Sequence, residues 1–270
     1  MAFRPLSVRR GIQEPFDFHP GIPAHIKVQL AEWVQSFLYH RYAGAYESMV
    51  NSVITLLQWP ITAADPQRRL QAVMERIDRD NDAFLDLLDL LCGAASPDKL
   101  QALDLILDTG MSEWRVRFEK PRGLEERLTE EARTAYRAAV SVGDPATEHI
   151  AEAWVKAFGR QAEAGAAWHA AVKALECLLQ PIVEPKNQRA TLGTMVKALR
   201  AKPEKWRFAI ASADGDLTAT PFLGALEIVG YEPGRHGTDP SRATIEQARI
   251  VVLQAVAVVE WLRAGALERI

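Results

Sequence analysis

The chain has 270 residues, of which 48% are hydrophobic, and a formal net charge of -3 at pH 7. This length suits one large domain or two of ordinary size, and the apolar content is enough for a packed core, which excludes wholesale disorder. The weakly negative charge excludes a generally basic nucleic-acid binder but leaves room for a local basic patch.

The cysteines and the apolar runs indicate the compartment. The two cysteines, Cys92 and Cys177, lie in apolar helical runs and make neither a disulfide framework nor a zinc site. No apolar run reaches the roughly eighteen residues of a membrane span, and the N-terminal stretch has no apolar segment typical of a secretory signal. We therefore expect a cytoplasmic protein with reduced thiols and no membrane partner.

The first half of the chain is predicted to be helical after an extended, proline-rich arm at residues 1–23. Apolar residues recur three and four positions apart, which is the period of an amphipathic helix. The predicted helices cover 24–41, 45–58, 66–77, a segment around 85–91 and 97–107. Residues 111–122 predict a short strand or an irregular connector, and Pro121-Arg122-Gly123 is the predicted boundary between two domains.

The acidic stretch that begins at Asp78 imitates a calcium-binding loop. Such a loop needs glycine at its sixth position and a long bidentate carboxylate at its twelfth, where this chain has Ala83 and Asp89. A buried helix capped by Asp80 or Asp82 fits the pattern better, so no metal is predicted here.

The second half is also predicted to consist of helices, which makes the fold class all-α with at most a small β-hairpin. The predicted helices cover 124–142, a segment from Pro145, 164–183, 191–199, 221–229 and a final helix from Asp239-Pro240 to Leu262. Residues 206–220 predict either a small hairpin or an ordered loop.

The segment 234–240 carries the clearest candidate chemistry. Arg235 is a permanent cation, His236 titrates near neutral pH, and both precede a long helix whose N-terminus favours anions. Arg235 could hold a phosphate while His236 moves a proton, and Asp239 could orient the imidazole or cap the helix. The alternative is a structural turn in which Arg235 pairs with a carboxylate.

Two further groups could support this site. Lys173 and Glu176 lie three apart on one helix, either as a half-buried ion pair or as part of the same site. A run of basic residues could follow a phosphate backbone or form a solvated helix end. The candidate RNA-binding residues in this run are Lys186, Arg189, Lys197 and Arg200. Phosphate-binding glycine loops, paired-histidine helices and nucleophile elbows do not occur, so no cofactor or metal is predicted.

Four stretches carry a resemblance to a known family. Residues 167–199, AWHAAVKALECLLQPIVEPKNQRATLGTMVKAL, and residues 234–262, GRHGTDPSRATIEQARIVVLQAVAVVEWL, resemble abortive-infection C-terminal domains of the HEPN group. The N-terminal FRPLSVRRGIQEPFDF and IKVQLAEWVQSFL are similar to AbiJ-type N-terminal domains. The resemblance implies an AbiJ-like helical domain over 1–122 and a HEPN-like helical bundle over 123–270.

The resemblance also implies a function. Active HEPN proteins are metal-independent endoribonucleases that act as homodimers in anti-phage defence, and His236 matches their motif histidine. Their arginine stands where this chain has Val229, Gly230 or Tyr231, whereas Arg235 is adjacent to the histidine. Two hypotheses follow: a dimeric ribonuclease that binds and cleaves RNA, or a non-catalytic interaction or ligand-sensing module in a defence or toxin–antitoxin system.

Overall fold

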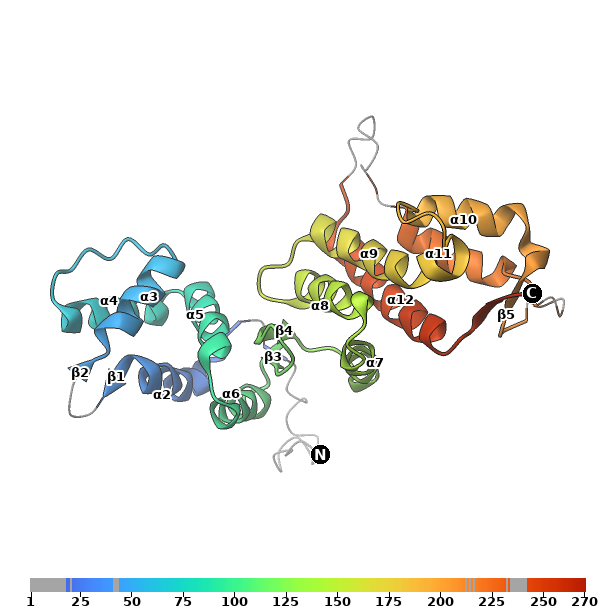
Figure 1. Cartoon of the computed structure of the whole chain (residues 1–270). Helices are drawn as coiled ribbons and strands as arrows, with labels where there is room; N and C mark the ends of the chain where they lie inside the picture. The colour runs from blue at the N-terminus through green and yellow to red at the C-terminus, as the bar shows by residue number, and fades with distance from the viewer. Residues whose placement is uncertain are drawn as a thin grey trace, which may run out of the picture. The chain divides into compact units, whose positions relative to one another are not determined.

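The chain folds into two compact units, Met1–Arg127 and Leu128–Ile270, named unit 1 and unit 2 below. The computed structural model describes residues 18–19, 21–40, 44–211, 213, 215, 217–231, 233 and 242–270. Both units are built mainly of helices, and the β-structure of these described residues is limited to three short antiparallel strand pairs (Figure 1). The predicted all-α fold class is confirmed.

The described residues of unit 1 form five α-helices and two small hairpins, which pack around one apolar core. Its elements are η1 (Ala24–Ile26), α2 (Lys27–Leu38), β1 (Tyr39–His40), β2 (Gly44–Ala45), α3 (Glu47–Leu56), α4 (Pro66–Arg79), α5 (Asn81–Ala94), α6 (Pro97–Thr109), β3 (Trp114–Arg117) and β4 (Gly123–Glu126). Side-chain caps fix where the later helices begin. The Asp65 carboxylate accepts a hydrogen bond from the Arg68 backbone N–H at 2.9 Å, directly before Pro66 opens α4.

The acidic stretch after α4 forms a helix start, as predicted. The Asp80 carboxylate accepts hydrogen bonds from the backbone N–H groups of Asp82 and Ala83, each at 3.0 Å. Helix α5 then continues through Asp89, so the residues that imitate a calcium loop lie on a helix capped by Asp80.

The segment after α6 differs from the prediction of a domain boundary at 122/123. β3 and β4 form a hairpin, and Pro121 and Arg122 lie in the connection between them. Two carboxylates hold this hairpin: Asp104 accepts from the Val116 N–H at 2.9 Å and Asp89 from the Leu124 N–H at 2.6 Å. Unit 1 therefore continues to Arg127.

The helix predicted from Leu124 begins later. Residues 123–126 satisfy their backbone groups in the β3–β4 ladder, so they cannot also form the first helical turn. The Thr129 side chain accepts a hydrogen bond from the Ala132 N–H and caps α7 (Glu130–Ser141). The predicted start was wrong because sequence periodicity does not show which strand a segment will pair with.

Unit 2 is a helical bundle around α9. Its elements are α7, α8 (Pro145–Phe158), α9 (Ala164–Val183), α10 (Leu192–Ala201), η2 (Pro203–Lys205), β5 (Trp206–Phe208), α11 (Thr220–Gly230), α12 (Ile245–Arg263) and β6 (Leu267–Arg269). Helix α9 contacts α8, α10, α11 and α12, and α8, α9 and α12 lie side by side (Figure 1). Small buried side chains line the α8 and α9 surfaces: Ala153, Ala157, Ala167, Ala170, Ala171 and Ala174. Such side chains allow two helix axes to approach closely.

The last helix starts later than predicted. Thr244 caps α12, and Thr244 and Gln247 form a reciprocal capping box, so the helix begins at Ile245. The predicted cap at Asp239-Pro240 lies outside the described residues, but residues 242–244 are described and are not helical. The apolar residues that recur three and four positions apart in this helix predict a buried stripe, and the structure confirms it, with Ile245 half-buried and the others buried: Ala248, Val252, Ala255, Val256, Val259 and Leu262.

Residues 206–208 form a strand, but its main partner lies at the far end of the chain. β5 pairs with β6, and Arg207 also forms an isolated bridge with Thr218. Among the described helices of both units, none is long and apolar enough to cross a lipid bilayer.

Arg263, at the end of α12, connects this helix to α7 and α8 through hydrogen bonds. Its guanidinium binds both carboxylate oxygens of Asp144, at 2.9 and 2.7 Å, and donates to the Ala139 carbonyl at 2.6 Å. Asp144 also caps α8 by accepting from the N–H groups of Ala146 and Thr147. The guanidinium hydrogen bonds lower the pKa of the Asp144 carboxyl below its ordinary value of 3.8.

Replacing Arg263 should destabilise unit 2 more than replacing an exposed arginine. Arg263→Met leaves the largely buried Asp144 carboxylate without its charge partner, and we expect the free energy of unfolding to fall by about 2–3 kcal/mol. Arg200→Met is the control, because that side chain is 60% exposed and its loss should cost less than about 1 kcal/mol. Urea unfolding of the full chain measures both, and equal effects would contradict the assignment.

The same network predicts a pH dependence. Because the folded-state pKa of Asp144 is below its unfolded value, the carboxylate stabilises the fold above the unfolded pKa, and this contribution disappears as the pH falls through the folded pKa. Asp144→Asn keeps a capping side chain but loses the charge. The variant should therefore be less stable at pH 7 and lose less stability than the parent chain between about pH 5 and pH 3, measured by urea unfolding.

Candidate functional site

The residues with the sharpest predicted chemistry, Arg235, His236 and Asp239, lie outside the described residues. The structure describes the two helices on either side of this segment. Helix α11 ends at Gly230, and α12 begins at Ile245. The described part of the candidate site consists of the side chains that hold the end of α11 and the start of the neighbouring helix α10.

Trp168 of α9 holds the last turn of α11. Its buried indole N–H donates to the Val229 carbonyl at 2.7 Å, which satisfies one of the carbonyls that a helix end leaves without a partner. Gly230 lies against the side chain of Leu192, the first residue of α10. The end of α11 is thus tied to α9 and packed against the beginning of α10.

Glu176 holds the start of α10. Its Oε1 accepts a hydrogen bond from the Leu192 backbone N–H at 2.7 Å, and Thr191 and Thr194 form a capping box at the same end. A carboxylate at this position is favoured by the partial positive charge of a helix N-terminus. Glu176 therefore has a structural partner beside the end of α11.

Lys173 behaves differently from Glu176. It is exposed on α9, whereas Glu176 is half-buried. Across the described part of the chain no ion pair joins the two side chains, so the interpretation as a half-buried pair is not supported. Lys173 and Glu176 both remain on the helix that carries Trp168.

The predicted RNA-binding cations gather around α10. Lys186 and Arg189 lie between α9 and α10, Lys197 and Arg200 lie on α10, and all four are exposed. Arg200 forms an ion pair with Glu227 of α11. Exposed Lys202, Lys205 and Arg207 continue the series beyond α10. This set of cations is named the α10 basic surface.

The described residues offer little nucleophilic or metal chemistry. Burial raises the pKa of the Cys92 thiol to about 12 and also raises the pKa of the Cys177 thiol, so both resist forming the reactive thiolate. Across the described ranges, no three His, Cys, Asp or Glu side chains gather as ligands for a metal ion. The candidate chemistry of unit 2 therefore rests on the α10 basic surface and on the residue types of the 234–240 segment.

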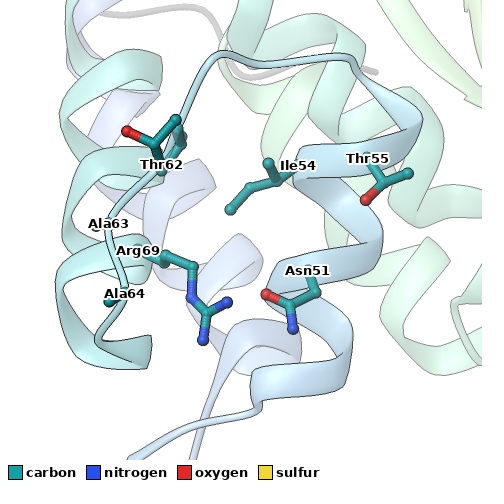
Figure 2. Close-up of a pocket in the computed structure, with 8 residues that line it drawn as sticks. Asn51, Ile54, Thr55, Thr62, Ala63, Ala64 and Arg69 are labelled. Carbon is teal, nitrogen blue, oxygen red and sulfur yellow. The ribbon is translucent and has the colours of Figure 1, made fainter.

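A concave feature lies in unit 1, where the sequence indicates no site. It is a hollow between α3 and the segment that leads into α4, and the Arg69 guanidinium points across it toward Asn51 (Figure 2). No motif signals it, because Asn51 and Arg69 come from two helices joined by an irregular loop. Only their packing brings them together.

Comparison with known proteins adds no family assignment: no family model, curated protein or solved structure matches this chain.

The role of Glu176 can be tested by two substitutions. Glu176→Ala removes the acceptor of the Leu192 N–H, and we expect amide hydrogen exchange in the first turn of α10 to become about fivefold faster or more, which corresponds to about 1 kcal/mol. Glu176→Gln keeps an oxygen acceptor and should retain most of the protection. Unchanged exchange in Glu176→Ala would show that the hydrogen bond does not hold this end of α10.

Proposed function

We propose that unit 2 binds RNA along the α10 basic surface and that Arg235 and His236 cleave it without a metal ion. The observation that carries the proposal is the position of the exposed cations: they lie on α10 and directly before and after it along the chain, and the first residue of α10 packs against the end of α11, which precedes the 234–241 segment in the sequence. A phosphate backbone held by these cations would pass close to the beginning of that segment.

The proposed chemistry follows from the two residue types. Cleavage by the 2'-hydroxyl requires removal of its proton and protonation of the leaving oxygen, and an imidazole can do both near neutral pH. A guanidinium offers paired donors to the charge that develops on the phosphate. In this scheme Glu176 and Lys173 support the site indirectly, and Asp239 orients His236.

The wider setting is proposed from the sequence resemblance. An anti-phage role, a HEPN-like C-terminal domain, assembly as a homodimer through that domain and a cytoplasmic location all belong to this proposal. A dimer would bring two 234–241 segments together on one RNA.

One observation favours a second candidate, a non-catalytic interaction or ligand-sensing module. Trp168 and Glu176, which lie beside the end of α11 and the start of α10, are both engaged in holding backbone groups. RNA binding without cleavage by the parent chain would support this candidate.

The catalytic proposal is tested by His236→Ala. We expect the purified full chain to cleave single-stranded RNA in the presence of a chelator, and the variant to lose at least about a hundredfold of this activity. Its melting temperature should stay close to that of the parent chain. Undiminished cleavage by the variant would contradict the assignment, and Arg235→Lys should retain binding while losing most of the rate because lysine lacks the paired donors.

The binding proposal is tested by salt dependence. Replacing Lys186, Arg189 and Lys197 together by glutamine should weaken RNA binding and lower the slope of log K against log salt by up to about 0.7 for each cation that contacts a phosphate. Replacing the exposed Arg68 and Arg79 of unit 1 is the control and should leave the slope unchanged. Fluorescence anisotropy with a labelled RNA at several salt concentrations measures both, and equal slopes in the two variants would exclude the α10 basic surface.

A further inference from the structure

The hollow in unit 1 has the size of a small-molecule site. Its volume is about 380 Å³, within the range of roughly 300 to 1,000 Å³ that is common for such sites. The residues that line it are Asn51, Ile54, Thr55, Ile61, Thr62, Ala63, Ala64 and Arg69. They come from α3, from the loop that follows it and from the first turns of α4.

The described lining of the hollow carries only positive charge. Among the described residues that line it, Arg69 is the only charged one and none is a carboxylate. The Arg69 side chain is 18% exposed, and in the described structure its Nε is buried and has no hydrogen-bond partner. Figure 2 shows the guanidinium and the Asn51 amide facing each other across the space, with Ile54 pointing into it.

Within the described residues Arg69 forms one ion pair, and a ligand can compete with it. Nη2 of Arg69 lies 2.8 Å from Oε1 of Glu47, whose side chain is 59% exposed and lies outside the lining of the hollow. An ion pair with such an exposed partner contributes little free energy, because water screens it. The remaining guanidinium donors match the paired oxygens of a carboxylate or a phosphate.

We propose that this hollow binds the anionic end of a small molecule that carries a carboxylate or a phosphate group. Arg69 is the main donor, the Asn51 amide is the second, and Ile54 and Ile61 cover the apolar remainder of the ligand. The site shares no residue with the α10 basic surface or the 234–241 segment. A result that contradicts the function proposed for unit 2 would therefore leave this proposal unaffected, and the reverse also holds.

The experiment is an NMR titration of the full chain with inorganic phosphate, with acetate and with neutral acetamide. We expect saturable shifts of the backbone amides of Thr62, Ala63 and Ala64 and of the Arg69 Nε–H with at least one of the two anions, and none with acetamide. Preference for phosphate or for acetate identifies the anionic group of the ligand. The absence of saturable shifts with both anions, or equal shifts with acetamide, overturns the proposal.

Three substitutions separate a specific site from general anion binding. Arg69→Gln should abolish the shifts, whereas Arg68→Gln, which changes an exposed neighbour that does not line the hollow, should leave the affinity unchanged. Glu47→Gln removes the competing carboxylate and should tighten anion binding about two- to fivefold. Equal loss in the two arginine variants, or unchanged or weaker binding in Glu47→Gln, overturns the assignment of Arg69 as the donor.

Discussion

Helix α9 is surrounded by four other helices of unit 2, and its sequence is suited to this position on nearly every side. Several of its alanines are buried, larger apolar residues such as Leu175 and Leu179 fill the core, and the polar groups Trp168 and Glu176 bind backbone atoms of α11 and α10. A long apolar helix that contacts this many partners leaves little freedom to the elements around it, because a shift of one helix would open cavities against the others. The rest of unit 2 depends on this central packing.

The packing of helices around α9 determines the geometry of the candidate site. The end of α11 is held by one hydrogen bond to Trp168 and by packing against Leu192, and the start of α10 is held by one hydrogen bond to Glu176. The chain thus leaves α11 from a fixed point beside the start of α10. The two halves of the chain also differ in the chemistry they offer: unit 2 presents many solvated cations, whereas unit 1 holds one partly buried guanidinium in a hollow.

Prediction from sequence worked where a local interaction decides the structure. Asp65, Asp80 and Ser96 cap helices within a few residues of themselves, so their positions could be predicted from residue type and spacing. It failed at Leu124, where pairing with β3 and the Asp89 carboxylate override the helical pattern. The hollow around Arg69 left no signal, since its residues are joined only by the packing of α3, the following loop and α4.

The sequence by itself determined the all-α class, the buried stripe of α12 and the presence of chemistry-bearing residues around 173–176 and 186–200, because periodicity and residue type are local properties. Tertiary structure alone decided that Glu176 binds the start of α10, that Arg263 joins α12 to α7 and α8 through Asp144, and that β5 pairs with the end of the chain. Each of these contacts joins residues far apart in sequence. How the helices pack against one another determines which of these residues meet, and a local sequence pattern does not show that packing.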